Sequence, residues 1–241
     1  MMGIPSGNVI LGQTVWPDKI APQRTYPDRV TPVVELAKGK RVLNIGCCGS
    51  DALVSQWTVH RTIASAASYC VGVDMYEAGV EKMKADGENV FLADGESFDL
   101  DEKDFDLVVL GDIIEHVSNP GLVLDNSNRH LKDGGSIVVS TPTPFALPLM
   151  MRIIRRGSFH VNSEHVSWFD PITLTGLLAR SGFEPEKIFW TEGSNRPALR
   201  FLQKRRLSFH QTFGIVAKKM QPVGPRSVIQ RIQTKLAIDG R

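Results

Sequence analysis

The stretch "FDLVVLGDIIEHVSNPGLVLDNSNRHLKDGGSIVVSTP", residues 105–142, decides the fold. An apolar run at 105–112 predicts a strand that is buried on both sides, and the pattern at 120–135 predicts a helix. A second apolar run at 136–142 predicts another strand. Two continuous apolar strands joined by a helix indicate a parallel sheet whose two faces are both covered.

The same alternation extends over most of the chain. Further helices are expected at 28–37, 52–67, 77–87 and 170–183. Further strands are expected at 41–45, 69–74, 89–94, 184–190 and 208–219. This order predicts an α/β fold with one doubly wound, Rossmann-like sheet.

The composition is that of an ordinary globular chain, with 42% hydrophobic and 22% charged residues among 241. The three cysteines, Cys47, Cys48 and Cys70, offer neither a disulfide framework nor the Cys-x-x-Cys spacing of a metal site. The first residues lack a signal-peptide pattern, and no apolar run approaches the roughly 20 residues of a membrane helix. We therefore expect a cytoplasmic protein.

The charges divide the chain into unlike parts. Residues 196–241 hold eleven Lys and Arg residues and one acidic residue, whereas the rest of the chain is acidic overall. We expect an irregular arm at 1–27, one domain at 28–219 and a basic tail at 220–241. The tail suggests an anionic partner. Nucleic acid is not favoured because no aromatic ladder for stacking bases accompanies the charges, and peripheral contact with a membrane stays open.

Glycines and acidic residues follow the predicted strands where each strand ends. They are residues 46–51, Asp74, Asp94 and 111–116. Parallel sheets bind ligands beyond the carboxyl ends of their strands, near the switch in strand order. These four places therefore predict one ligand site.

The first of these places reads "GCCGSD", residues 46–51. Gly46 permits a sharp turn and a close approach of the ligand to the backbone, and the following helix start offers free N–H groups. The string lacks the Gly-x-Gly-x-x-Gly pattern of dinucleotide sites, and Asp51 at the helix start disfavours a pyrophosphate. Taken alone, the loop is also compatible with an ordinary turn between a strand and a helix.

Two acidic residues indicate what the ligand is. Asp74 can accept hydrogen bonds from both hydroxyls of a ribose, and Asp94 can accept from the exocyclic amine of adenine. The N–H of Gly95 or Glu96 can donate to a ring nitrogen. A helix cap for Asp74 and a turn for Asp94 are the structural alternatives. A pocket for adenine and ribose without a phosphate cradle points to S-adenosylmethionine rather than to NAD or ATP.

Several motifs between residues 28 and 190 carry a family resemblance. They are "VLNIGCCGS", "YCVGVDM", "VFLADGESFDL", the 105–142 stretch and "EHVSWFDPITLTGLLARSGF". In this order they resemble the successive motifs of class I S-adenosylmethionine-dependent methyltransferases. The most similar subgroup includes ubiquinone-biosynthesis O-methyltransferases and many small-molecule or glycan methyltransferases. The resemblance implies a seven-stranded, mostly parallel sheet whose last strand is antiparallel.

The resemblance also implies the cofactor-binding residues. They are Asn44, Gly46, Cys47, Gly49, Asp74, Met75, Asp94, Gly95, Glu96, Gly111 and Asp112. The loop at 46–49 would line the methionine and ribose, Asp74 would hold the ribose, and Met75 would pack on the adenine. Residues 94–96 would address the adenine edge, and residues 111–112 would flank the methionine and its sulfonium.

The chain departs from the family at three positions of the first motif. Asn44 stands where the family usually has Asp or Glu, and Cys48 and Ser50 stand near positions that are usually Gly. Asn44 can still form a hydrogen bond, but it carries one negative charge less. These departures motivate an alternative function, that of a non-catalytic binding or scaffold protein on the same fold.

The string Asp112-x-x-Glu115-His116 has three interpretations. On a helix these side chains would share a face, with Asp112 at the methyl group and His116 as a general base for an acceptor hydroxyl. Alternatively, the three side chains, with His165, could bind a divalent cation, a possibility that we do not favour. In the third interpretation they shape the loop and cap the helix that follows.

The insertion at 143–169 is the place where the acceptor is expected. Its apolar segment carries Arg152, Arg155 and Arg156, which is typical either of a lid or of a surface for an anionic membrane or lipid-linked substrate. His160 and His165 face an acceptor or merely pack. We expect methyl transfer to a small-molecule, glycan or lipid-linked acceptor, at oxygen. The acceptor itself cannot be predicted from such a segment.

Overall fold

The computed structural model describes residues 21–49, 54–158, 162–191, 201 and 207–220. In chain order the elements are β1 (Gln23–Thr25), α1 (Val30–Ala37), β2 (Arg41–Ile45), α2 (Val54–Ala66), β3 (Tyr69–Asp74), α3 (Glu77–Ala85), β4 (Val90–Leu92), β5 (Phe105–Gly111), α4 (Pro120–His130), β6 (Leu131–Pro142), α5 (Leu147–Arg156), α6 (Pro171–Arg180), β7 (Phe183–Thr191), the 3-10 helix η2 (Leu207–Phe209) and β8 (Thr212–Lys219). None of the helices in these ranges has the length and apolar character that crossing a membrane requires.

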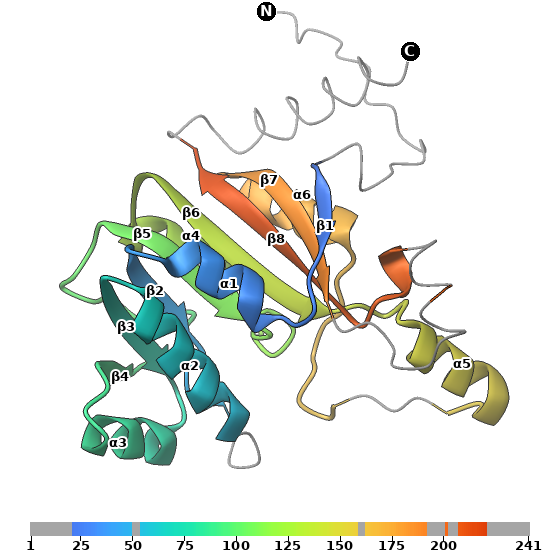
Figure 1. Cartoon of the computed structure of the whole chain (residues 1–241), viewed down its shortest axis with the longest axis horizontal. Helices are drawn as coiled ribbons and strands as arrows, with labels where there is room; N and C mark the ends of the chain where they lie inside the picture. Colours follow the sequence, from blue (N-terminus) through green and yellow to red (C-terminus); the bar gives the residue numbers. More distant parts are fainter. Residues whose placement is uncertain (1–20, 50–53, 159–161, 192–200, 202–206, 221–241) are drawn as a thin grey trace, which may run out of the picture.

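The strands form one sheet in the order β1-β7-β8-β6-β5-β2-β3-β4 (Figure 1). Strand β2 pairs in parallel with β3 on one side and with β5 on the other. The chain therefore runs outward from β2 to β4 and then returns to the other side of β2. This reversal between β2 and β5 is the place where doubly wound sheets bind their ligands.

All seven predicted strands are present, and the last one, β8, is antiparallel to both of its neighbours, β6 and β7. An eighth strand was not predicted. Gln23–Thr25, in the arm that was expected to be irregular, pairs in parallel with β7. The Trp190 ring nitrogen donates to Gln23 Oε1 at 2.8 Å, and this long-range contact holds β1 at the sheet edge.

The helix predicted at 120–135 is shorter, because α4 ends at His130 and β6 begins at Leu131. Leu131 pairs with Phe105 ahead of an irregularity in the β5–β6 register. The Lys219 ammonium donates to the carbonyl oxygens of Asn128 and Leu131, at 2.8 and 2.6 Å. A residue on the last strand thus satisfies carbonyl groups at the helix end.

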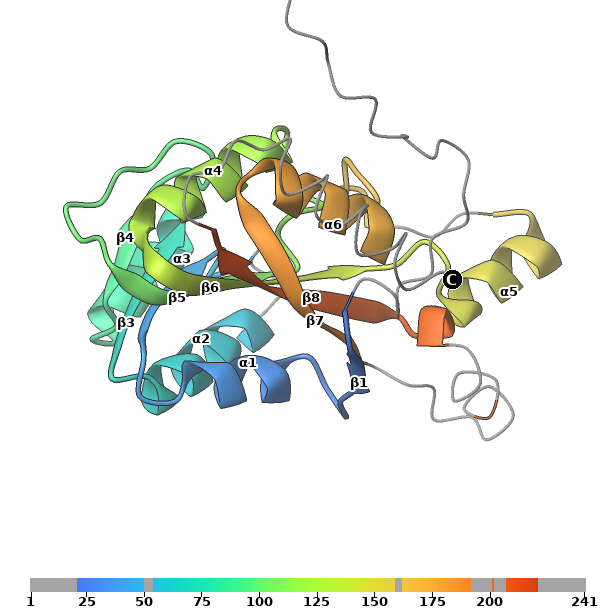
Figure 2. The same ribbon diagram turned by 90° about the horizontal axis from the view of Figure 1, so that it is seen from above.

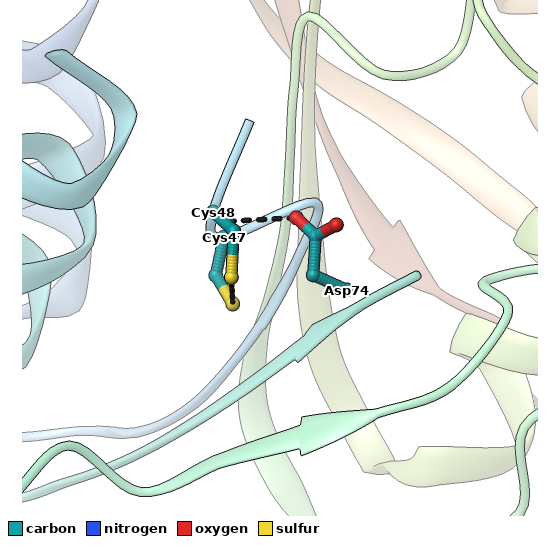
Figure 3. A group of neighbouring side chains, drawn as sticks. All are labelled: Cys47, Cys48 and Asp74. Carbon is teal, nitrogen blue, oxygen red and sulfur yellow. Dashed lines mark hydrogen bonds between the residues drawn. The ribbon is translucent and has the colours of Figure 1, made fainter. Parts of the chain in front are cut away.

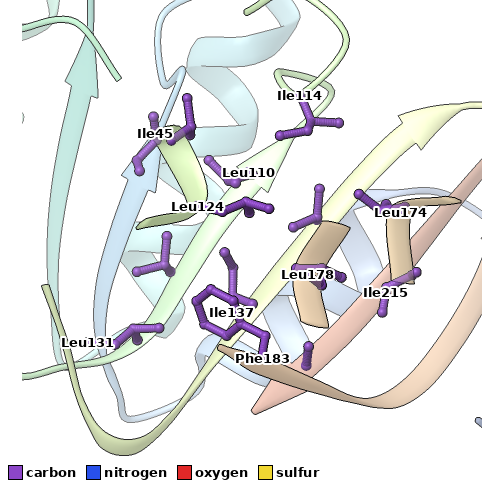
Figure 4. Close-up of a cluster of buried hydrophobic side chains, with 14 of the residues drawn as sticks. Ile45, Leu110, Ile114, Leu124, Leu131, Ile137, Leu174, Leu178, Phe183 and Ile215 are labelled. Carbon is purple, nitrogen blue, oxygen red and sulfur yellow. The ribbon is translucent and has the colours of Figure 1, made fainter. Parts of the chain in front are cut away.

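Apolar side chains fill both faces of the sheet. Helices α1 and α2 cover one face and α4 and α6 cover the other (Figure 2). On the α4 and α6 face, Leu110, Leu124 and Ile137 are buried together with Leu178 (Figure 4). Each such side chain contributes about 1.5–3 kcal/mol when it is fully buried. The sheet is therefore a firm platform for the loops that follow its strands.

Some expectations lie outside the described residues. They concern Ser50, Asp51, His160, most of the arm at 1–27 and the tail at 220–241, of which only residue 220 is described.

Candidate active site

The turn after β2 requires glycine at its first position. Gly46 has a φ of +76°, and a Cβ there would lie 2.1 Å from Ile113 Cγ1. The Gly46 N–H donates to the carbonyl of Val73 at 2.8 Å, which ties the turn to the end of β3. The backbone of the turn is therefore held close to the loop after β5, where a side chain would not fit.

The Asp74 carboxylate is held by the same turn. Its Oδ2 accepts from the Cys48 N–H at 2.7 Å (Figure 3). The same oxygen accepts from the Gly49 N–H at 3.3 Å. Its Oδ1 accepts from the Tyr76 N–H at 2.9 Å. Burial raises the pKa of Asp74, although the amide donors oppose the shift. The Met75 N–H is a further donor, so backbone groups supply about as many donors as the two oxygens have acceptor positions, and Asp74 braces the turn.

Asn44 is buried in the middle of this edge and its side chain is hydrogen-bonded. Its Nδ2 lies 3.0 Å from His60 Nδ1, and the other ring nitrogen faces Glu88 at 3.9 Å. Burial lowers the pKa of His60, which favours a neutral ring that accepts from the Asn44 amide. An amide therefore suits this position, because a carboxylate would need a proton to form the same bond.

The predicted adenine residues lie at the ends of β3 and β4. Met75 is 74% exposed, which leaves its side chain available to a ring. Asp94 Oδ1 accepts from the Glu96 N–H at 2.9 Å. The Glu96 carboxylate, however, accepts from the N–H groups of Ser118 and Asn119 at 2.8 and 3.0 Å. The Glu96 side chain thus braces the start of α4, and hydrogen bonds from Asn119 lower its pKa.

Gly95 also lies at this edge, beneath the turn after β2. A Cβ on Gly95 would lie 3.1 Å from Ile45 Cγ2, and its carbonyl accepts from the Asn126 side chain at 3.3 Å. Its backbone is therefore fixed from both sides.

Asp112 forms an ion pair that sequence reasoning missed. Its φ is +53°, a conformation that non-glycine residues rarely adopt, and its carboxylate pairs with Arg29. The Ser140 hydroxyl donates to the other carboxylate oxygen at 3.0 Å. Arg29 directly precedes α1, and nothing in its local sequence connects it with a residue 83 positions away.

A small pocket that is partly open to solvent lies beside this ion pair. Polar and glycine residues from the ends of three central strands line it together with Arg29 and apolar residues of α1 and α2. The lining residues are Arg29, Val33, Asn44, Gly46, Val59, Ile63, Val109, Gly111 and Ser140. The pocket thus brings the predicted residues Asn44, Gly46 and Gly111 together.

The segment after Asp112 is a turn rather than a helix, so the expected helical face is absent. Glu115 is 1% exposed, and its Oε2 accepts from the Thr141 hydroxyl at 3.0 Å. Its Oε1 has no hydrogen-bond partner within the described structure. Burial, with a smaller contribution from Asp112, raises the pKa of Glu115 to about 8.

His165 joins Glu115 and His116 from the far side of the insertion. The carbonyl of Glu115 accepts from the N–H groups of Val166 and Ser167, at 2.9 and 3.3 Å, and so fixes the returning segment. The two histidine rings meet edge to face with centroids 4.6 Å apart. Ligand atoms of the Glu115, His116 and His165 side chains all lie within 4.8 Å of one another.

His165 is itself incompletely bonded. Its Nδ1 is buried without a hydrogen-bond partner in the described structure, and its ring packs against Trp168 at 5.8 Å. Burial, and to a smaller extent His116, lowers the pKa of His165, which favours a neutral ring. The cluster therefore offers hydrogen-bond donors and acceptors that a polar ligand, a water or a cation could complete.

Helix α5 extends from the carboxyl end of β6 toward the outside of the molecule (Figure 1). Leu147, Met150, Met151 and Ile154 recur at the spacing of one helical face. Leu147 is buried, whereas Ile154 is 74% exposed, so the apolar face begins on the body and ends in solvent. Its three arginines are exposed.

Comparison with known proteins gives one family. The family model described as a methyltransferase domain matches residues 20–188. The demethylmenaquinone methyltransferase of Staphylococcus saprophyticus is 27% identical over 192 residues, covering 68% of this chain and 79% of that protein.

Two further relatives match over shorter stretches. The demethylmenaquinone methyltransferase of Staphylococcus carnosus is 31% identical over 130 residues, covering 50% of this chain and 52% of that protein. The ubiquinone biosynthesis O-methyltransferase of Coxiella burnetii is 31% identical over 110 residues, covering 43% and 44%. The chain thus spans about half the length of these two relatives or less.

Solved structures share the fold. A SAM-dependent methyltransferase from Archaeoglobus fulgidus superposes with a TM-score of 0.60 at 20% identity, over 79% of this chain and 91% of that one. The N-methyltransferase NodS from Bradyrhizobium japonicum, in complex with S-adenosyl-L-homocysteine, gives 0.55 at 14% identity, over 80% and 86%.

Proposed function

The chain belongs to the methyltransferase domain family and depends on S-adenosylmethionine, and from this premise we propose that it methylates a hydroxyl oxygen of an apolar, lipid-like small molecule. The observation that carries the proposal is the cluster of Glu115, His116 and His165, in which two buried atoms have no hydrogen-bond partner among the described residues. The quinone-related names of the relatives support the same class of acceptor.

The residues at the strand ends fit the cofactor. The narrow turn at Gly46 has no room for a Cβ, and Asp74, buried at the end of β3, would accept from a ribose hydroxyl beside its backbone donors. Arg29 and Asp112 place a cation and an anion at the pocket, which matches the zwitterionic amino acid end of the cofactor. When bound, S-adenosylmethionine supplies a methyl group on a sulfonium, which is a strong electrophile.

We assign His116 as the general base. An imidazole can accept the hydroxyl proton as the oxygen attacks the methyl group. His165 meets its ring edge to face and limits its rotation. Positioning supplies much of the rate of such a transfer, so Asp112, on the loop between cofactor and base, acts by orienting the methyl-bearing end.

The insertion at 143–169 is proposed as the acceptor-binding part of the domain at 28–219. Its two ends both lie at the site: α5 follows β6, and His165 is held beside Glu115. The apolar face of α5 and the half-exposed Phe145 suit a ligand with a hydrocarbon portion. Exposed arginines on the same helix suit an anionic lipid surface as the source of that ligand.

A His116→Gln variant tests the proposal. Gln keeps hydrogen-bonding capacity but cannot serve as a base, so kcat should fall about 10²- to 10⁴-fold while S-adenosylhomocysteine affinity stays the same. Transfer of radiolabelled methyl from S-adenosylmethionine to reduced demethylmenaquinone and to a polyprenylated catechol measures kcat. Calorimetry with S-adenosylhomocysteine measures binding.

Two results would contradict the proposal. If the variant retains full kcat, His116 is not the base. If label enters only water-soluble acceptors, the proposed acceptor class is wrong. If the label is bound to carbon in the product, the proposed acceptor atom is wrong. Loss of activity on adding a chelator, restored by Zn²⁺ or Fe²⁺, would instead assign Glu115, His116 and His165 to a divalent cation.

A further inference from the structure

Three sulfur atoms are gathered beneath the cofactor turn. Cys48 Sγ lies 3.7 Å from Cys47 Sγ and 3.3 Å from Met83 Sδ. All three side chains are buried, with exposed fractions of 1% or less, and they form a small cluster of their own with Val80 and Val90. The two cysteine sulfurs lie side by side in Figure 3. The proposed methyl transfer uses none of these sulfurs.

The distance between the two cysteine sulfurs suits a shared metal ion better than a disulfide. In a disulfide the sulfurs are about 2.05 Å apart, so Cys47 and Cys48 would have to approach much more closely. Two thiolates on one tetrahedral ion, with metal–sulfur bonds of about 2.3 Å, are separated by about 3.8 Å. The observed 3.7 Å between the cysteine sulfurs is close to that value.

The donor types select the kind of ion. Thiolate and thioether ligands are soft and favour ions such as Cu(I), whereas Mg²⁺ and Ca²⁺ need oxygen ligands. The nearest carboxylate, that of Asp74, is occupied by backbone N–H groups. We propose that Cys47, Cys48 and Met83 form a site for one soft monovalent cation of the Cu(I) or Ag(I) type. On binding, each thiol releases its proton to solvent and coordinates the ion through sulfur.

Such a site would be coupled to the cofactor. The N–H groups of Cys48 and Gly49 hold Asp74, the residue proposed to bind the ribose. Because Met83 Sδ lies only 3.3 Å from Cys48 Sγ, an ion bound by both sulfurs must push them apart, and this shifts the backbone that carries these N–H groups. The cation therefore weakens cofactor binding, and by linkage the cofactor weakens cation binding by the same factor.

Titration with Ag(I) under anaerobic conditions tests the site on the intact enzyme. Native mass spectrometry should show one tightly bound Ag(I) per chain, and calorimetry should give its dissociation constant. Cys48→Ala should raise that constant at least about 100-fold, and Met83→Leu, which keeps the volume, about tenfold. Cys70→Ala is the matched control, because Cys70 belongs to a different apolar cluster, and it should leave Ag(I) affinity unchanged.

A saturating concentration of S-adenosylhomocysteine should raise the dissociation constant for Ag(I) about 5- to 150-fold. In the wild-type chain, Ag(I) should protect Cys47 and Cys48 but not Cys70 from alkylation, which keeps the test valid if Cys48→Ala does not fold. Absence of tight Ag(I) binding would overturn the proposal. So would loss of binding in Cys70→Ala, or protection of Cys70 alone.

Discussion

The two sides of the site differ in the chemical groups that form them. The cofactor wall, Gly46–Gly49 with Asp74, is made of backbone N–H groups and one glycine turn that neighbouring strands hold. The acceptor wall, Glu115, His116 and His165, is made of side chains from two segments about 50 residues apart, with two buried atoms left unpaired. The cofactor wall is rigid, and the strands that precede its residues determine where these residues lie. The acceptor wall depends on the protonation of its side chains and on the ligand, water or cation that bonds to its two unpaired atoms.

The largest effect is expected from Gly46→Ala, which changes the turn of the rigid cofactor wall. The added Cβ would lie 2.1 Å from Ile113 at a φ of +76°. Backbone strain alone costs about 1–3 kcal/mol, and the clash adds to it. Affinity for S-adenosylhomocysteine, measured by calorimetry, should fall at least about 100-fold, and urea unfolding should show lower stability.

Gly121→Ala is the matched control for that variant. Gly121 lies in helix α4 with open space around it, so Ala there should be neutral or stabilise the fold by up to about 1 kcal/mol. Equal cofactor affinity in Gly46→Ala and Gly121→Ala would mean that the cofactor wall is not rigid.

Glu115→Gln tests the dependence of the acceptor wall on protonation. Because burial raises the pKa of Glu115 to about 8, the folded chain keeps a proton that the unfolded chain loses near pH 4.5. Wild-type stability therefore falls as pH rises from about 4.5 to about 8. Gln cannot ionise, so the loss of stability between pH 5 and pH 8 should be roughly 3 kcal/mol smaller in the variant.

Urea unfolding of both proteins at pH 5 and pH 8 measures this difference. The same pH dependence in both would show that Glu115 is ionised in the folded chain at neutral pH, and hence that a cation accompanies it.

Arg29→Gln tests whether the ion pair between the cofactor wall and the acceptor wall contributes to cofactor binding. Arg29 pairs with Asp112 beside the pocket and is proposed to receive the carboxylate of the cofactor. Removing one charge-assisted hydrogen bond should weaken S-adenosylhomocysteine binding about tenfold in calorimetry. Arg24→Gln, on β1, should have no effect, and similar losses in both variants would assign the change to net charge.

The smallest effect is expected on α5. Ile154→Ser removes an apolar side chain that is 74% exposed, so stability should change by no more than about 0.5 kcal/mol. If the apolar acceptor contacts this face, its KM should rise roughly threefold. Ile172→Ser, at an exposed isoleucine on α6, should leave KM unchanged. An unchanged KM in both variants would remove α5 from the acceptor site.

The same contrast explains what the sequence could predict. Strands β2, β3 and β5 follow from continuous apolar runs, and their ends place Gly46 and Asp74 at one edge without further information. Strand β1 has no apolar pattern and depends on Trp190, far along the chain. Local patterns could therefore not reveal it.

The acceptor wall was predicted only in part. His116 was recognised because it follows a strand, but the expected helical face failed, since the backbone turns at Asp112 with a positive φ. His165 was named beside His116 as a possible ligand of a cation, and it reaches His116 because the neighbouring N–H groups donate to the Glu115 carbonyl. Arg29 and Asp112 meet across 83 residues, and that contact leaves no trace in residue spacing.

The position of β8 has a consequence for how the chain folds during synthesis. β8 is the last described strand in sequence, yet it lies between β6 and β7 and is hydrogen-bonded to both along most of its length. Until residues 212–219 leave the ribosome, the edges of β6 and β7 stay open, and open strand edges invite aggregation. Protection of these edges by chaperones is therefore most needed late in translation, and a stop codon before Thr212 should yield insoluble protein.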